Sequence, residues 1–458
     1  MASSRKSVRW LVGSITVVFG GLLIVCARLG LLSASSQLDE ELKLAEQQGL
    51  PLTLADLHLS SVPEDQNAGP LLVNAVELMK TQPGDPVTVL SHWGSTYFKP
   101  TVSDKAASIA VEVLRPILDI AVRASKRPHL KFELQWEDGT LMVGDAYPVK
   151  QLAKGLVARA HVQRNKRDYD AAIDSLDAAS RLGRLLSESP GFLAMDSRQA
   201  IEAIVAAEAA NLLRQCSTTR VVAGIRHILA DFGEVPSLRN ALKGDFIRCR
   251  IYISHMPYAG ESGPMASSSD TLGPDEWKLM RLKAVRDLNE ANYVKIARLT
   301  YAAVPSSSGT HRQVEDAFKD IEKTEDSFTK IGDMAASKLP FVGEATIDFW
   351  LECIARRRIL SAALDIFEVR SKNGTFPATW SKPGLEGSDP FSEKPLSYRR
   401  VGSGFVLYSF GRDRQDDGGR PYTLDDGKYS KDISFEYPKL SVRPVKPVKL
   451  GPPGSSGD

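Results

Sequence analysis

An uncharged apolar run at residues 10–27 opens the hydrophobic pattern of the chain. As an α-helix, at about 1.5 Å per residue, it would be roughly 27 Å long, which approaches the thickness of the bilayer hydrocarbon. Basic side chains among residues 5–9 precede the run, and acidic side chains at residues 39–41 follow it. The positive-inside rule then predicts a single-pass protein of the inner (cytoplasmic) membrane, with residues 1–36 as cytoplasmic tip and transmembrane anchor and the bulk of the chain extracytoplasmic.

Two other interpretations of this run stay open. A cleaved signal peptide would end at the small residues 33–35, and a lipoprotein signal would attach a lipid to Cys26. Each of the three interpretations exports the rest of the chain, so all of them predict an extracytoplasmic location.

Helix-like periodicity dominates residues 37–340, where apolar residues recur every three or four positions. The predicted helices cover residues 69–80, 103–126, 147–163, 169–188, 195–215, 218–231, 238–254, 275–303 and 311–337. The pattern D-Y-x-x-A-x-x-x-L-x-x-A at residues 168–179 resembles the second half of a tetratricopeptide unit. Only one such unit is found, so we expect a single αα-hairpin within an α-helical domain rather than a repeat array.

The charged residues of this region give no catalytic pattern. Glu202 and Glu208 lie on an alanine-rich predicted helix and are interpreted as solvated helix charges, while Asp245 and Arg248 are close enough in sequence for a buried ion pair. The seven histidines are scattered, and the motifs HExxH, GxSxG and GxxxxGK[ST] are absent. No catalytic residue is predicted, and whether the chain is an enzyme is left open.

The pattern changes to strand-like alternation near the C-terminus. A helix is predicted over residues 354–370, followed by a β-hairpin with strands at 396–401 and 404–410 and a closing strand at 432–435. These elements predict a small α+β domain over residues 341–438. Residues 439–458 are rich in proline, lysine and glycine, which is typical of a disordered tail. The predicted fold class is therefore mainly α, with an N-terminal transmembrane helix, a helical domain and this α+β domain.

Composition narrows the functional classes. With 58 basic and 56 acidic residues the net charge is +2, which gives no support for a nucleic-acid binder. The four cysteines form no CxxC motif, so a zinc ribbon is not expected. Buried free thiols are expected at Cys216, Cys249 and Cys353, with one disulfide among them as the alternative.

The segment after the second hairpin strand is dense in aspartate and glycine. Asp413, Asp416 and Asp417 lie in one loop, and such a loop presents the hard oxygen ligands that calcium prefers. A solvated acidic turn is the alternative, because turns commonly contain aspartate and glycine. Arginines at residues 412, 414 and 420 would then balance the charge.

Four segments of the C-terminal region resemble the globular domain of the major pseudopilin of type II secretion. They lie at residues 373–377 (N-G-T-F-P), 389–398 (D-P-F-S-E-K-P-L-S-Y), 407–413 (L-Y-S-F-G-R-D) and 432–433 (D-I). The resemblance covers residues 350–437, and it implies a calcium site held by Asp413 and Asp432, with Asp416 and Asp417 in the same loop. The layout of the whole chain also resembles uncharacterised bacterial membrane-anchored proteins.

These observations predict a membrane-anchored, extracytoplasmic structural or interaction protein whose helical domain binds a protein partner. The resemblance adds calcium as an expected stabilising ion. A cell-envelope hydrolase with its site in the helical domain is the alternative from another class, and it requires acidic or histidine side chains that converge in space. A component of a secretion or pilus-like machine is a further alternative. The apolar run lacks the glutamate that a pseudopilin helix carries at its fifth position, which weighs against this last function.

Overall fold

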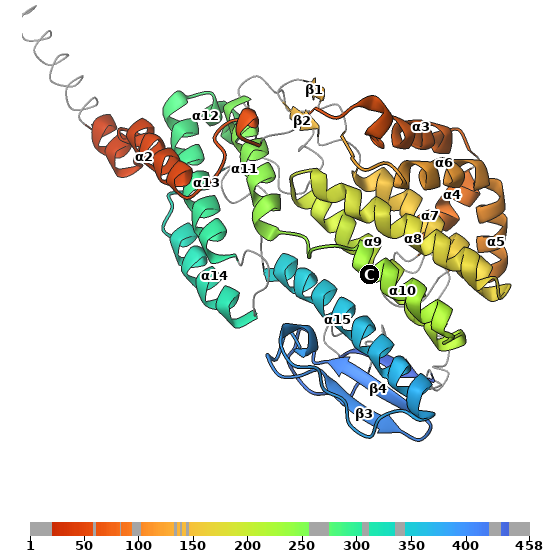
Figure 1. The fold of residues 1–458 in the computed structure, drawn as a ribbon. Coiled ribbons are helices and arrows are strands. Elements are labelled where there is room, and N and C mark those ends of the chain that lie inside the picture. The colour runs from red at the N-terminus through yellow and green to blue at the C-terminus, as the bar shows by residue number, and fades with distance from the viewer. Residues whose placement is uncertain are drawn as a thin grey trace, which may run out of the picture.

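The structure, a computed structural model, describes residues 21–57, 61–82, 84–93, 102–131, 135–137, 140–142, 146–255, 274–304, 311–334, 344–420 and 432–438. Over these residues the chain is mainly helical, with a small antiparallel sheet near its C-terminal end (Figure 1). The α-helices are α2 (Ala34–Gln47), α3 (Gly69–Lys80), α4 (Gly84–His92), α5 (Asp104–Val113), α6 (Arg115–Ser125), α7 (Ala146–Asn165), α8 (Tyr169–Leu185), α9 (Phe192–Gln215), α10 (Thr219–Asp231), α11 (Leu238–His255), α12 (Pro274–Met280), α13 (Lys283–Ala303), α14 (His311–Asp326) and α15 (Glu344–Asn373). The predicted tail lies outside the described residues.

The predicted transmembrane anchor is not supported, and both the fold class and the inner-membrane location are corrected on this point. Residues 21–28 are helical, while residues 10–20 of the predicted span lie outside the described part of the chain. None of the described helices combines the length and the apolar character that crossing a bilayer requires. Helix α13, for example, combines apolar positions with charged ones, because it packs against other helices of the protein.

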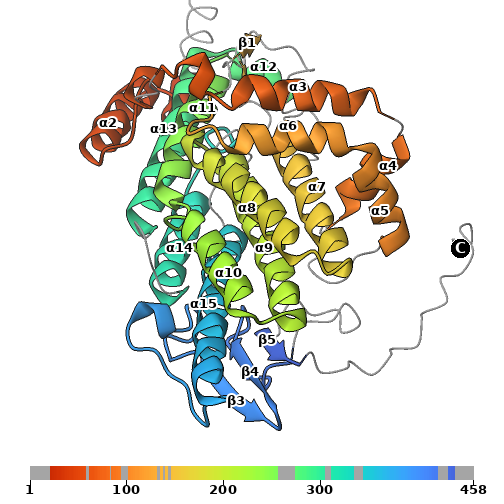
Figure 2. The same ribbon diagram turned by 45° about the vertical axis from the view of Figure 1, so that its right-hand side comes forward.

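Helix α8 lies at the centre of the helical region, where it contacts α6, α7, α9 and α10 (Figure 2). The predicted αα-hairpin is present as α7 and α8. Their turn contains Arg167 in the left-handed region, and the side chain of Asp168 caps α8 by accepting a 3.3 Å hydrogen bond from the backbone N–H of Ala171. The single helix predicted over residues 103–126 is divided at Leu114 into α5 and α6, because Leu114 leaves the helical conformation.

A second group of helices packs beside this region. Helix α13 contacts α2, α11 and α14, and Phe246 and Tyr293 fill the core between α11 and α13. Ion pairs support the packing: Arg298 Nε lies 3.1 Å from Glu41 Oε2, which connects α13 to α2. The short strands β1 (Gln135–Glu137) and β2 (Thr140–Met142) pair with each other near α11.

The C-terminal sheet packs against α15. Strands β3 (Ser397–Val401), β4 (Gly404–Ser409) and β5 (Ile433–Tyr437) form an antiparallel sheet in the order β3-β4-β5. The predicted hairpin is therefore present, with Gly402 at φ +57° in its turn. Aromatic rings from the helix and the sheet meet edge to face in the core between them, at Phe367, Phe376, Phe405, Phe435 and Tyr437.

Helix α15 also joins the sheet to the helical region. It begins about ten residues earlier than predicted, and Trp350 in its first turns is buried and donates a 2.8 Å hydrogen bond to the carbonyl of Pro236. The buried apolar side chains of α3–α10, α15 and the sheet form one continuous core. The predicted domain boundary at residues 340/341 stays a prediction.

Candidate functional site

The close approach of α8 and α10 builds the candidate site. Gly224 of α10 lies against Ile173 of α8, so that a Cβ at position 224 would be only 2.8 Å from the end of that isoleucine side chain. One turn further along each helix are His227 and Asp177, because residues three or four apart share a helix face. The glycine therefore brings α10 close enough for these two side chains to meet.

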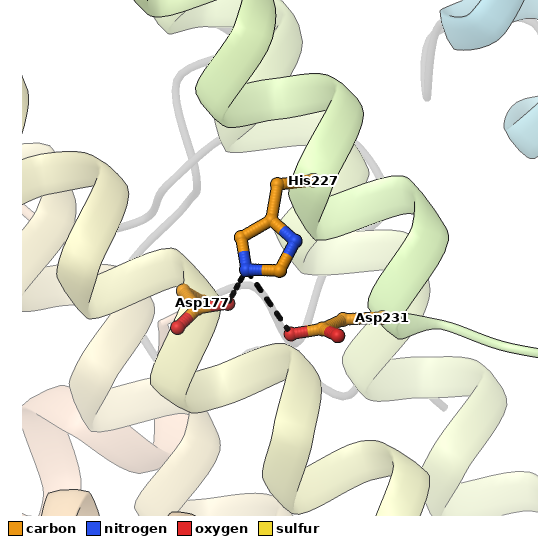
Figure 3. Close-up of side chains that lie close together, drawn as sticks. All are labelled: Asp177, His227 and Asp231. Carbon is orange, nitrogen blue, oxygen red and sulfur yellow. Dashed lines mark ion pairs between the residues drawn. The ribbon is translucent and has the colours of Figure 1, made fainter.

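Three side chains that can bind metals converge at this place: Asp177 from α8, and His227 and Asp231 from α10. In Figure 3 the imidazole of His227 points toward both carboxylates. Its Nε2 lies 3.9 Å from Asp177 Oδ1 and 4.0 Å from Asp231 Oδ2. Both distances exceed the range of a hydrogen bond. Within the described residues this is the one group of three His, Cys, Asp or Glu side chains whose ligand atoms all lie within 4.8 Å.

Arg181 forms ion pairs with both carboxylates. Its Nη2 lies 2.9 Å from Asp177 Oδ2, and its Nε donates a 3.1 Å hydrogen bond to Asp231 Oδ2. The second oxygen of Asp177, Oδ1, is shut off from solvent and accepts no hydrogen bond from the described residues. This enclosed oxygen is the one nearest to His227.

The two carboxylates influence each other's protonation. The pKa of Asp177 is raised from 3.8 to about 6, first by burial and then by the neighbouring Asp231, although Arg181 draws it down. Burial alone would also raise the pKa of Asp231, but hydrogen bonds from Asp177 and Arg181 hold it below its ordinary value. The two carboxylates therefore titrate as a pair, and burial together with their mutual repulsion favours a proton held between them at acidic pH.

The residues predicted to bind calcium lie at the far end of the molecule, around the end of β4. Asp432 is 2% exposed, and its Oδ2 accepts a 2.6 Å hydrogen bond from the backbone N–H of Gly419. Asp416 Oδ1 accepts from the Tyr408 hydroxyl at 2.9 Å and from a backbone N–H. Among the described residues, Asp413 accepts a hydrogen bond from the backbone N–H of Gln415, two residues later.

The structure brings the charges of Asp416 and Asp417 close to Asp432, since both raise its pKa. Burial is the larger cause, and the pKa of Asp432 reaches about 6. Its Oδ1 is enclosed and accepts no hydrogen bond from the described residues. Within the described part of the chain, however, no three of the four aspartates bring their oxygens within 4.8 Å of one another. The calcium site stays a prediction.

Asp389, which was not assigned a role, is the carboxylate that organises the C-terminal loops. It is 1% exposed, and it accepts hydrogen bonds from Ser392 Oγ at 2.7 Å, from Ser409 Oγ at 2.6 Å, and from the backbone N–H groups of Phe391 and Phe410. It thus holds the loop before β3 against the end of β4. An aspartate directly before a proline is the sequence signal for such a turn-forming carboxylate.

Two glutamates of α9 that were interpreted as solvated are in fact buried. Glu202 accepts hydrogen bonds from Arg357 at 2.6 and 2.8 Å and from Arg198 at 2.9 Å. Glu208 binds Arg164 at 2.6 Å. That interpretation was wrong because Arg164 of α7 and Arg357 of α15 reach these glutamates from other helices, whereas Arg198 lies one turn before Glu202 on α9 itself. The predicted pair of Asp245 and Arg248 is present, with Arg248 Nη2 at 2.5 Å.

Comparison with known proteins gives no relative: no family model, curated protein or solved structure matches the chain. The function is therefore inferred from the residues of this chain alone.

Proposed function

We propose that this chain is a structural or interaction protein whose helical region binds a protein partner. The observation that carries the proposal is an apolar pair on the solvent side of α5. Ile109 is 54% exposed and Val113 is 43% exposed, one turn apart, while the opposite face of α5 buries Ala107, Ala110 and Val111. Large apolar side chains repeated along an exposed helix face are typical of a surface that receives an apolar face of another protein.

The buried charges support a structural role for the core. Glu202 on α9 is held by Arg198 and Arg357, and the thiol of Cys353 donates to it at 3.1 Å, so this cluster connects α9 to α15. Burial and the charge of Glu202 raise the pKa of Cys353, and burial raises the pKa of Cys249 to about 12. Both thiols are thus kept protonated, which disfavours a nucleophilic role.

Site-specific photo-crosslinking tests the proposed surface. A photoreactive phenylalanine analogue at position 109 is expected to form an adduct with a partner protein in cells that produce the full chain. The same analogue at position 123, an exposed arginine site on α6, is the matched control. Adducts at both positions alike, or at neither, would contradict a binding surface on α5.

We further propose that the C-terminal domain is pseudopilin-like and that calcium stabilises it through Asp432, with Asp413, Asp416 and Asp417 near it. The enclosed Oδ1 of Asp432, which accepts no hydrogen bond from the described residues, supports this, because a buried carboxylate oxygen in that state favours a cation. The melting temperature of the full chain is expected to be higher in calcium than in a chelator. Asp432→Asn should remove the difference, and an unchanged melting temperature in the wild type would refute the proposal.

A hydrolase is a second candidate, favoured by the convergence of Asp177, His227 and Asp231 in the helical region. The exposed imidazole of His227 is accessible to a substrate, and a neighbouring carboxylate is the usual partner of a catalytic histidine. A panel of chromogenic carboxylic and phosphoric esters tests this, with His227→Ala as the variant. Turnover that persists in the variant, or is absent from the wild type with and without divalent metals, argues against it.

A further inference from the structure

We propose that Asp177, His227 and Asp231 bind a divalent transition-metal cation, through Nε2 of the histidine and one oxygen of each carboxylate. Imidazole and carboxylate donors together suit zinc and its first-row neighbours. The proposal goes beyond the interaction function, because it concerns α8 and α10 and not the exposed face of α5. It is also independent of the calcium proposed for the C-terminal loops.

The distances from His227 Nε2 to the two carboxylates fit a shared metal ion better than direct hydrogen bonds. The separations of 3.9 and 4.0 Å from Nε2 are too long for hydrogen bonds. Two ligands that each lie about 2.0–2.1 Å from a tetrahedral zinc ion are about 3.4 Å apart. Each pair therefore needs to close by only about half an ångström to reach that geometry. The side chain of His227 is 60% exposed, so its ring has room to make this movement.

The helices hold the three ligands in place before any ion binds. His227 and Asp231 are four residues apart on α10 and so lie on one face of it. The contact between Gly224 and Ile173 fixes the distance to α8, from which Asp177 comes. Ligands already placed by packed helices lose little conformational freedom on binding.

The local electrostatics favour a cation at this place. Two carboxylates share a single arginine, Arg181, so the cluster carries one net negative charge when His227 is neutral. Asp231 is the last residue of α10, where the helix dipole is negative, and the last turn contains no basic residue. A helix end of this kind normally attracts cations and repels carboxylates. A bound metal ion would offset both the net negative charge of the cluster and the repulsion between Asp231 and the helix dipole.

The enclosed oxygen of Asp177 is a further observation that favours a cation at this place. Arg181 pairs with Oδ2 of this residue, while Oδ1 is enclosed and accepts no hydrogen bond from the described residues. A buried carboxylate oxygen in that state costs free energy unless a donor or a cation reaches it. Oδ1 is the oxygen nearest to the exposed imidazole of His227, and three protein ligands leave a fourth zinc coordination position for water.

Zinc titration of the full chain tests the proposal. Isothermal calorimetry at pH 7.5 is expected to show one zinc ion per chain at this site, and His227→Ala and Asp231→Asn are each expected to weaken it at least tenfold. Substitution with cobalt(II) should give visible absorption bands that are lost in the same variants. His129→Ala is the matched control, because His129 forms an exposed pair with Glu188 at 3.2 Å and should leave binding unchanged.

The variants remain interpretable because His227 is exposed and its loss leaves the core intact; circular dichroism melting curves without metal verify this. Wild-type protein that binds no zinc or cobalt in this titration overturns the proposal. It is equally overturned if both variants keep wild-type affinity, or if His129→Ala weakens binding as much as His227→Ala does.

Discussion

Two acidic clusters, one around the end of β4 and one between α8 and α10, differ in how closely their residues are spaced along the sequence. The aspartates around the end of β4 stand close together in the sequence, yet their oxygens are spread among backbone amides, a tyrosine and solvent. The cluster of α8 and α10 joins His227 and Asp231, four residues apart on α10, to the distant Asp177 of α8, and it gathers three ligand atoms. Density of acidic residues along a chain is thus a poor measure of convergence in space.

The clusters also resemble each other in one respect. Each contains a carboxylate oxygen that is enclosed and unpaired, at Asp177 and at Asp432, and burial raises the pKa of each group to about 6. Their neighbours differ: an imidazole stands beside Asp177, whereas backbone amides and two further carboxylates stand beside Asp432. The first setting suits a transition metal, and the second suits calcium.

The largest effect is expected from Asp389→Ala, which removes the carboxylate that really holds the C-terminal loops. The hydroxyl and backbone N–H groups that donate to Asp389 would lose their acceptor in the core, so the free energy of unfolding should fall by about 3–5 kcal/mol. Urea denaturation measures this. Asp413→Ala, whose only described side-chain contact is local, is the control and should cost less than about 1 kcal/mol. Equal losses would contradict this division of roles.

Zinc should stabilise the wild-type chain and leave Asp231→Asn unaffected. At a free zinc concentration of about 100 times the dissociation constant, the gain is about 2.7 kcal/mol. Differential scanning calorimetry with and without zinc measures it. Stabilisation of equal size in Asp231→Asn would place the metal elsewhere.

The stability of the metal-free chain should depend on pH through Asp432. Its folded pKa of about 6 lies above the ordinary 3.8, so its contribution to stability is complete at low pH and is lost as the pH rises through 6. Asp416 and Asp417 face the same group, and their charges add to the effect. In a chelator, the free energy of unfolding should be higher at pH 5 than at pH 8. This difference should be about 1–2 kcal/mol larger in the wild type than in Asp432→Asn. Parallel pH profiles would refute this.

The smallest effect is expected from Arg181→Gln, which removes the cation that competes with the metal. Zinc affinity should rise a few-fold, which is a gain of about 1 kcal/mol in binding free energy, since the two carboxylates lose their positive partner. Arg220→Gln is the matched control, because Arg220 forms an exposed ion pair with Asp170 between the same two helices. Calorimetric titration of both variants compares them, and weaker binding in Arg181→Gln would show that the arginine positions the ligands.

Much of the local structure was readable from the sequence. The αα-hairpin of α7 and α8 and the β-hairpin at Gly402 follow from short-range patterns, so they were predicted, although the cap by Asp168 was not. The transmembrane anchor was predicted from the length of an apolar run and the charges flanking it, and it is not supported. Glu202 was misjudged because its partner Arg357 lies far along the chain. The helical spacing of His227 and Asp231 was visible, but the third ligand depends on the packing of Gly224 against Ile173, which no local pattern reveals.

The most direct measurement is an anomalous difference map, recorded at the zinc absorption edge from crystals grown with zinc. A peak bonded to Nε2 of His227 and to oxygens of Asp177 and Asp231, and absent below the edge, is the predicted result. A map in which these three side chains carry no peak, while zinc binds elsewhere or not at all, would contradict the metal site between α8 and α10.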